Sequence, residues 1–327
     1  MDKTSLQTIR SKVLPAASKL FNEIDITRRY SRKAKIKIQD IREWWNNNSY
    51  SYGINSNKEY KDVGIPPGPI ESVITEYERK YKKHLKESCD SQNRVGGLFI
   101  PYDSIKDGDV LDVACGLGWA SINLALNGCK VRAIDLTPNA VSFLKDYAKY
   151  KNLSISVSQM SAEELKFQSD SFDFVLGWGF IMHTENPEIA LNELIRVVKP
   201  GGKVVIYFYY KHSISYWWNI YFLRGILMGY LIKFGGSTVK LVSRFTDGQS
   251  FGGNSKTLVL TRSWFVKNIN YLDDVKISFT GWGPPSLIDS FPISKLPLGK
   301  FLPLKFKKLI SGRYGFGHIC TIQKLSI

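Results

Sequence analysis

The stretch VLDVACGLGWA, residues 110–120, decides the fold of this chain. A short apolar run that contains Asp112 leads into two glycines around Leu117, which is the pattern of a buried strand, a tight turn and the start of a helix. The glycines remove side chains that would keep a ligand away from the backbone, and the first N–H groups of the helix face the same space. The stretch therefore predicts a site for a nucleotide-derived ligand directly after a strand.

Strand and helix patterns alternate after this stretch. The strand patterns are DVLDVA, KVRAID, LSISVSQM, FDFVLGW and KVVIYFYY, with further strands expected near 275–279 and in GHICTIQK. Strands joined by crossover helices form a parallel, doubly wound sheet, which binds ligands beyond the carboxyl ends of its strands. We expect an α/β fold with a mostly parallel, seven-stranded sheet.

Length sets the domain organisation that we expect. A chain of 327 residues with 43% hydrophobic content can bury one full α/β core and still carry large additions. We expect a basic helical prefix over residues 1–94 and one domain over 95–327. Within that domain we expect a lid insertion at about 211–262 and a proline-rich segment at about 283–303.

The net charge of +16 is unevenly spread. Residues 1–100 carry 19 Lys and Arg against 12 Asp and Glu (+7), residues 101–205 carry 10 against 13 (−3), and residues 206–327 carry 16 against 4 (+12). Basic flanks suit a nucleic acid, an anionic membrane surface or an anionic small substrate, and they also suit a plain solvated surface.

The cysteines indicate a reducing compartment. Cys89, Cys115, Cys129 and Cys320 have no C-x-x-C spacing, and the chain has no signal-peptide pattern. We therefore expect a cytoplasmic protein without a disulfide framework. The histidines His183, His212 and His318 have no metal-ligand spacing either, so we expect no metal site.

Three motifs in this order resemble the class I S-adenosylmethionine-dependent methyltransferases. They are VLDVACGLG, AIDLTPNAV and AEELKFQSDSFDFVLGWGFIMHTENPEIALNELIRVVKPGG, and the resemblance covers roughly residues 70–210. It is closest to the branch with the ubiquinone and menaquinone methyltransferases. The resemblance implies a Rossmann-like fold and S-adenosyl-L-methionine as the methyl donor.

Two carboxylates are the leading candidates for holding the donor. Asp135 ends the second strand pattern, 17 positions after Gly118, where a carboxylate can accept from both ribose hydroxyls of a nucleoside. A dinucleotide dehydrogenase would use the same acid, but its fingerprint has glycine where this chain has Ser121. The resemblance implies that Asp112 helps to hold the cationic methionine end. The alternative for both acids is an ordinary turn or surface carboxylate.

The resemblance also implies a set of further donor contacts. The family usually has an aspartate before the Ala-Glu pair to accept from the adenine amino group, and this chain has Ser161, a weaker neutral acceptor. Trp178 offers a cation–π contact to the sulfonium or simply packs in the core. The remaining expected contacts are Ala114, Gly116, Gly118, Leu136, Ala162 and Gly177.

Methyl transfer needs a base only when the acceptor must lose a proton. His183 follows the fourth strand pattern and His212 follows the fifth, so both are expected on the ligand side of the sheet. An imidazole titrates near neutral pH, so each is a candidate catalytic base, with a structural role as the alternative.

The aromatic stretch after the fifth strand bears on the acceptor. On a helix from about Ile214, Trp217, Tyr221 and Arg224 share one face. Such a face suits an amphiphilic acceptor with an anionic group or shallow docking on an anionic membrane, and a lid helix with Arg224 in solvent is the alternative.

These features favour methyl transfer to a small or amphiphilic acceptor, with an anionic group as one option. An RNA methyltransferase is one alternative, although GWGF stands where a base-modifying enzyme commonly has a D/N-P-P-Y loop, so a nucleic-acid partner is disfavoured. A catalytically inactive donor-binding protein is the other alternative. The sequence does not set the acceptor atom or the oligomeric state.

Overall fold

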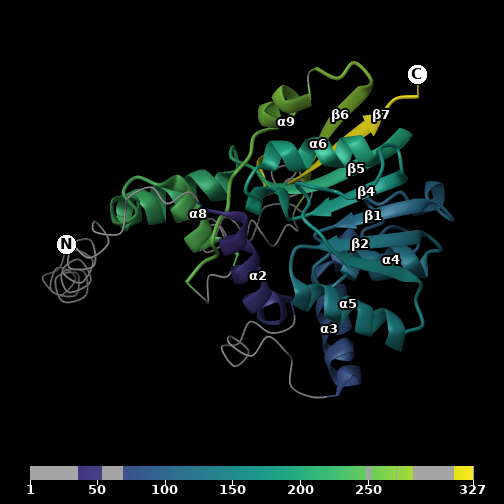
Figure 1. Cartoon of the computed structure of the whole chain (residues 1–327). Helices are drawn as coiled ribbons and strands as arrows, with labels where there is room; N and C mark the ends of the chain where they lie inside the picture. The colour runs from purple at the N-terminus through teal and green to yellow at the C-terminus, as the bar shows by residue number, and fades with distance from the viewer. Residues whose placement is uncertain (1–35, 54–68, 248–251, 270, 283–312, 327) are drawn as a thin grey trace, which may run out of the picture.

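A computed structural model describes residues 36–53, 69–247, 252–269, 271–282 and 313–326 (Figure 1). Its centre is a seven-stranded sheet with the order β3-β2-β1-β4-β5-β7-β6. The strands are β1 (Asp109–Val113), β2 (Lys130–Asp135), β3 (Ile155–Gln159), β4 (Phe172–Trp178), β5 (Val198–Tyr209), β6 (Val275–Trp282) and β7 (Gly317–Lys324). Strands β1 to β5 pair in parallel, and β7 runs antiparallel to both β5 and β6. The predicted mostly parallel α/β sheet is confirmed.

Alternating side chains of the strands bury both faces of the sheet. Leu111 and Val113 pack on one face with α6 (Pro187–Val197) and α9 (Arg262–Ile269). Val110 and Ala133 face the other side, which α4 (Trp119–Leu126) and α5 (Pro138–Tyr150) cover. A parallel sheet needs cover on both faces, which explains the near-continuous apolar runs of its strands.

Helix α6 packs on the sheet through only part of its apolar residues. Leu194 and Ile195 are buried, but Ile189 is 49% exposed, because the inward positions of the first turns are Ala190 and Leu191. The helix ends at Val197, and β5 begins at the next residue, so Pro200 lies inside the strand.

The described part of the N-terminal prefix consists of α2 (Ile38–Gly53) and α3 (Ile70–His84), while residues 1–35 and 54–68 lie outside the described residues. Helix α3 packs on α5, with Tyr77 edge-on to Phe143 at a ring distance of 5.4 Å. The hydroxyl of Tyr147 on α5 donates to Glu78 on α3 (2.7 Å). Helix α3 therefore shares the core of the sheet domain.

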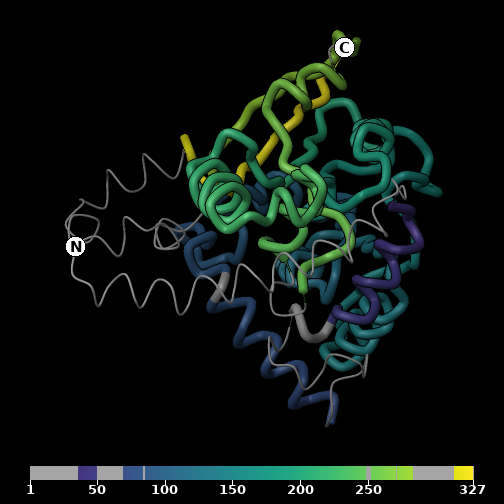
Figure 2. Tube along the Cα trace, turned by 90° about the vertical axis from the view of Figure 1, so that its left-hand side faces the viewer, coloured from purple at the N-terminus to yellow at the C-terminus, as the bar shows by residue number. Residues whose placement is uncertain are grey.

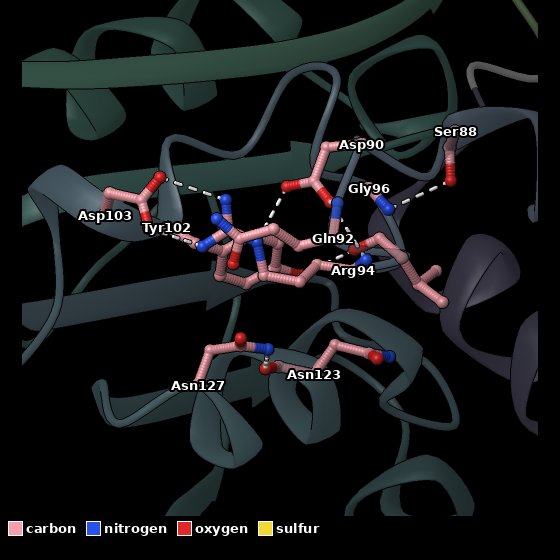
Figure 3. Close-up of polar contacts among 10 residues, drawn as sticks. Ser88, Asp90, Gln92, Arg94, Gly96, Tyr102, Asp103, Asn123 and Asn127 are labelled. Carbon is pink, nitrogen blue, oxygen red and sulfur yellow. Dashed lines mark hydrogen bonds and ion pairs between the residues drawn. The ribbon is translucent and has the colours of Figure 1, made fainter.

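The connection from α3 to β1 is fixed by polar contacts (Figure 3). Arg94 donates to Asp90 (2.7 Å) and, through both terminal nitrogens, to Asp103 (2.6 and 3.0 Å). The Tyr102 hydroxyl donates to the carbonyl of Val95 (2.6 Å). Residue 94, where we expected the prefix to end, thus lies inside a continuously packed segment.

The insertion after β5 folds into its own small cluster. It contains the helices η5 (Ser215–Leu227), α7 (Tyr230–Lys233) and α8 (Thr238–Phe245) around buried Tyr216, Ile220, Leu241 and Val242. Figure 1 shows it at the end of the sheet to which the parallel strands point, and Figure 2, seen from that side, shows it and α2 in front of the sheet. The expected proline-rich segment at 283–303 lies outside the described residues.

Helix η5 is a π-helix, not the α-helix that the sequence predicted. Its i to i+5 bonding widens each turn, so residues seven apart no longer share a face. Trp217 still contacts Tyr221 at a ring distance of 5.0 Å, but Arg224 lies over Phe245 of α8 (4.8 Å) and is half-buried. Within the described residues, no helix is long and apolar enough to cross a membrane.

Candidate active site

The candidate residues meet where the order of the strands reverses. After β1 the chain adds β2 and β3 on one side and β4 and β5 on the other, and such a switch point leaves a crevice at the carboxyl ends. Asp112 pairs with Ala133 across β1 and β2, and Val113 pairs with Gly177 across β1 and β4. Asp112, Asp135 and Gly177 therefore lie along one edge of the sheet.

The two glycines of the turn after β1 serve different purposes. Both have positive φ angles, +53° at Gly116 and +88° at Gly118. A Cβ added at Gly116 would meet no atom within 4 Å, so open space lies beside the backbone there. A Cβ at Gly118 would come within 2.3 Å of the Leu144 side chain, so this glycine allows α4 to approach α5. Gly116 is the glycine that borders a ligand space.

The backbone of Ala114 in the same turn is left-handed, with φ of +55°. An L-residue in this conformation is strained by about 1–2 kcal/mol, and such strain concentrates at functional sites. Ala114 leads from β1 directly into the turn that borders the space beside Gly116.

Asp135 is buried, and its carboxylate is already oriented. Its Oδ2 accepts from the backbone N–H of Gly116 (2.9 Å), and its Oδ1 accepts from the backbone N–H and the hydroxyl of Thr137 (2.9 and 2.8 Å). A carboxylate has about four acceptor positions, so about one is left for a ligand in this arrangement. Burial raises the pKa of Asp135.

Thr137 is a site residue that sequence reasoning missed. It stands at the N-cap position of α5, as its place before Pro138 predicts, but its side chain makes no capping bond. The hydroxyl donates to Asp135 instead. The D-x-T spacing was the available signal, because hydroxyl and carboxylate side chains two residues apart commonly close a local turn.

Asp112 is 2% exposed, and among the described residues Ser121 holds its carboxyl group. Its Oδ2 accepts from the backbone N–H (3.0 Å) and the hydroxyl (2.6 Å) of Ser121 on α4. Burial raises the pKa of Asp112 to about 7, against the lowering effect of the Ser121 bonds, and the charge of Asp135 raises it further. Ser121, the residue that departs from a dinucleotide fingerprint, therefore orients this carboxyl group.

The segment after β3 is tied to the end of β2. The backbone N–H of Met160 donates to the carbonyl of Asp135 (2.9 Å), and the Gln159 amide donates to the carbonyl of Leu136 (3.1 Å). The Ser161 hydroxyl oxygen accepts from the backbone N–H of Glu163 (3.1 Å), and Ala162 packs against the core. The structure thus brings Leu136, Ser161 and Ala162 to the same edge as Asp135.

Trp178 does not have a ring face free for the expected sulfonium contact. Phe99 stacks on one side at 4.5 Å and Tyr207 stacks at 4.5 Å, with interplanar angles of 19° and 18°. Trp119 lies edge-on at 5.5 Å. A cation–π contact needs an open ring face, so in this arrangement Trp178 packs inside an aromatic stack. Its neighbour Gly177 has no room for a side chain, because a Cβ would come within 2.4 Å of Phe180.

His183 lies at the carboxyl end of β4 but is held on both ring nitrogens. Its Nδ1 is 2.7 Å from the carbonyl oxygen of Lys256, and its Nε2 is 3.3 Å from Oδ2 of Asp247. The Tyr209 hydroxyl donates to the same carboxylate (2.8 Å). His183 and Asp247 are both buried. These contacts join β4, β5 and the insertion. Asp247 lies against Nε2, the nitrogen with which a catalytic His183 would accept a proton.

Asp247 is a second residue that sequence reasoning missed. The available signal was its charge, because Asp247 is the single acidic residue in the basic stretch 211–247.

His212 lies apart from this network. It is exposed, contacts Tyr210 at a ring distance of 5.6 Å, and lines a shallow hollow of about 280 Å³ with Ser213, Ile214, Trp217 and Trp218. The Tyr209 ring contacts His183, and the ring of the next residue, Tyr210, contacts His212. Successive side chains of an extended chain point to opposite sides of the backbone. The structure therefore does not bring the two candidate bases together.

Helix α2 covers the same end of the sheet. Trp45 packs edge-on against the His183 ring at 5.0 Å, and Asn46 accepts from the backbone N–H of Asn139 at the start of α5 (3.1 Å). The backbone N–H of Ile38 donates to Glu185 (2.7 Å). This helix bridges the segments that follow β2 and β4, which places part of the prefix over the crevice.

Comparisons with known proteins place the crevice in a family. Residues 111–206 match the family described as "Methyltransferase domain". An uncharacterized protein of Mycobacterium tuberculosis is 35% identical over 111 residues, which are 34% of this chain and 40% of that protein. The ubiquinone biosynthesis O-methyltransferase of Rickettsia bellii is 31% identical over 105 residues, 32% of this chain and 43% of that enzyme. The aligned part thus spans less than half the length of these relatives.

Among solved structures, a methyltransferase from Methanosarcina mazei has a TM-score of 0.48 at 20% identity, over 68% of this chain and 94% of that one. The matched segment contains β1, its glycine turn and the strands up to β5. Residues 111–206 thus match a methyltransferase domain, as the motifs of this segment predicted. Enzymes of this family use S-adenosylmethionine as the methyl donor.

Proposed function

We propose that this chain transfers a methyl group from S-adenosylmethionine to a small or amphiphilic acceptor. One observation supports this most strongly: open space borders the backbone of Gly116, directly beside the buried carboxylate of Asp135 that Gly116 and Thr137 hold in place. A nucleoside donor needs a carboxylate for its ribose and close approach to a glycine backbone, and both are present at the switch point of the sheet.

The other parts of the donor would follow along this edge. Asp112 would hold the ammonium of the methionine portion, since its Oδ1 accepts no bond from the described residues. Ser161 would accept from the adenine amino group through the lone pair that Glu163 leaves. The donor would supply an activated methyl group on a cationic sulfur, and the sulfur would leave as a neutral thioether.

The chain itself would contribute position and exclusion of water. Little acid or base chemistry is required when the acceptor atom is already nucleophilic, so holding it in line with the methyl group provides most of the acceleration. Helix α2 and the insertion, joined to the sheet through Trp45, His183 and Asp247, would cover the reacting atoms. An acceptor that is a hydroxyl would pass its proton to His183 only after Asp247 moved off Nε2.

The acceptor class is proposed from the surroundings of the insertion. The hollow beside Trp217 and His212 offers ring surface, and the segment that lines it, residues 211–247, contains five Lys and Arg against one Asp. One relative is named for ubiquinone biosynthesis, but the similarity lies in the donor-binding domain, so it does not specify the acceptor here. A cytoplasmic location is part of this proposal.

The proposal is tested by donor turnover. The chain is incubated with methyl-labelled S-adenosylmethionine and with lipid and water-soluble fractions of cell extract, and S-adenosylhomocysteine and labelled products are measured by mass spectrometry. We expect acceptor-dependent product with the native chain and at least tenfold less with Asp135→Ala when the donor is well below saturation. Product that disappears after ribonuclease treatment would favour RNA as the acceptor. Donor binding without turnover in any fraction would favour an inactive donor-binding protein.

A further inference from the structure

The outer side of the insertion exposes large apolar side chains. They are Trp217 (44% exposed), Phe222 (37%), Ile226 (51%), Leu227 (64%), Met228 (51%) and Ile232 (70%), and we call this set the apolar outer face. All of them belong to η5, α7 and the turn between these helices. The inner side of the same helices already supplies the buried cluster around Tyr216 and Ile220, so the outer residues are not needed to fold the insertion.

Exposed apolar area of this kind is uncommon on a monomer. Exposed single apolar residues are ordinary, but a contiguous run such as Ile226-Leu227-Met228, each at least half exposed, marks a surface that binds something.

The charge around the apolar outer face is one-sided. Residues 211–247 contain the cations Lys211, Arg224, Lys233, Lys240 and Arg244. The single acid of this segment is Asp247, which is buried against His183 and Tyr209. The exposed charge of this segment is therefore positive, and Lys211 and Lys240 are both exposed.

We propose that the apolar outer face docks on the surface of an anionic lipid bilayer. Apolar side chains on a short helix enter the boundary between headgroups and acyl chains to about 5–10 Å, while flanking cations attract anionic headgroups. This combination of rings, aliphatic residues and lysines on one projecting insertion matches that environment. Docking of this kind needs no membrane-crossing helix.

Other occupants fit this surface less well. A second copy of the chain paired through the same segment would bring like charges such as Lys211 and Lys240 together, and the single acid of the segment, Asp247, is buried. A nucleic acid would neutralise the cations but would leave Ile226, Leu227 and Ile232 against a polar backbone. An anionic lipid interface offers both an apolar layer and negative charge.

The position of the face adds a consequence that rests on the proposed function. The insertion lies at the carboxyl ends of the parallel strands (Figure 1), and its Asp247 contacts His183 at 3.3 Å. A docked chain would therefore present the edge of the sheet that holds Asp112 and Asp135 toward the bilayer side, where an amphiphilic acceptor would be dissolved. The docking itself does not depend on methyl transfer.

Co-sedimentation of the full chain with vesicles tests the docking. Vesicles of phosphatidylcholine alone are compared with vesicles that also contain phosphatidylglycerol, at low and at high salt. We expect binding to the anionic vesicles at least tenfold tighter than to the neutral ones, and loss of this difference at high salt, because screening shortens the reach of charges from about 10 Å at 0.1 M to about 3 Å at 1 M.

Matched variants identify the surface. The double substitution Ile226→Glu and Leu227→Glu should weaken anionic-vesicle binding at least tenfold, whereas Ile189→Glu on α6, an isoleucine of nearly equal exposure, should leave it unchanged. Lys240→Glu should weaken binding severalfold, and Lys149→Glu on α5 should not. Thermal unfolding and S-adenosylmethionine binding of each variant show that the domain is intact.

Several results would overturn the docking proposal. The native chain could stay in the supernatant with anionic vesicles, or variants of the apolar outer face could bind the vesicles like the native chain. Light scattering could also show a dimer that the double substitution Ile226→Glu and Leu227→Glu abolishes. Tighter retention by RNA than by anionic vesicles would also contradict it. Because S-adenosylmethionine binding is measured separately, failure of docking remains distinguishable from failure of the proposed methyl transfer.

Discussion

The affinity for S-adenosylmethionine should depend on pH through Asp112. The pKa of this buried carboxyl group is raised to about 7, so at pH 7 about half of the ligand-free protein carries the carboxylate that the donor ammonium prefers. At pH 5.5 only about 3% does, which predicts donor affinity about 15-fold weaker than at pH 7. The donor ammonium stays protonated over this range, since an α-amino group titrates near 7.7–8.0.

Calorimetry at pH 5.5, 6.2 and 7.0 measures this dependence. In buffers of different ionisation enthalpy, donor binding near pH 6 should release close to one proton. Asp112→Asn should bind more weakly at pH 7 and should show almost no change in affinity over the range. Native affinity that varies less than twofold, or an Asp112→Asn variant with the native pH dependence, would refute the assignment of Asp112 to the ammonium.

The same pKa has a consequence for stability. A carboxyl group whose pKa is higher in the folded than in the unfolded state favours folding at low pH and loses that contribution as pH rises. For Asp112 this loss occurs between pH 3.8 and about pH 7, and it lowers the free energy of unfolding by at most about 4 kcal/mol. Bound donor should restore part of this loss above pH 7.

Three further predictions concern the frame of the site. Gly118→Ala should lower the free energy of unfolding by about 3 kcal/mol, because the added Cβ would clash with Leu144. Gly116→Ala should lower it by about 1 kcal/mol but weaken donor binding at least tenfold. Equal effects of the two substitutions on donor binding in folded variants would contradict the different roles of the two glycines. In a double-mutant cycle, His183→Gln and Asp247→Asn should couple by at least about 1 kcal/mol, and additive effects within about 0.5 kcal/mol would show no working contact. The pKa of His318 is lowered to about 4 by burial and by Arg262, so stability should fall by about 2–3 kcal/mol as pH drops from 6.5 to 4.5 in urea unfolding; a flat profile would contradict a buried neutral imidazole.

The fold was predictable because its determinants are local. The glycine turn after β1, the apolar runs of the parallel strands and the Thr-Pro and Asn-Pro helix starts each specify one step of an alternating chain, and crossover handedness leaves few ways to assemble them. The type of η5 was not predictable in this way. Aromatic residues such as Trp217 and Tyr216 have no preference that separates a π-helix from an α-helix, and the packing of η5 against α8 cannot be read from the sequence.

Residues of the site were predictable where their role follows from their position along the chain, at the end of a strand. Asp135 and Gly116 follow from their places at strand ends. Thr137 and Asp247 escaped prediction because their roles depend on where a side chain turns in three dimensions. For Trp178 the sequence left a ligand contact and core packing both open, and the structure stacks it against Phe99 and Tyr207, which are distant in the sequence.

The central claim is that Asp135 and the Gly116 turn form a site for S-adenosylmethionine. Titration calorimetry of the native chain and of Asp135→Ala, with S-adenosylmethionine and with NAD, tests it most directly. We predict that the native chain binds S-adenosylmethionine and does not bind NAD measurably, and that the variant, still folded by circular dichroism, binds at least tenfold more weakly, because one charge-assisted hydrogen bond contributes about 1.5–3 kcal/mol. Unchanged affinity in a folded Asp135→Ala variant, or tighter binding of NAD than of S-adenosylmethionine, would contradict the claim.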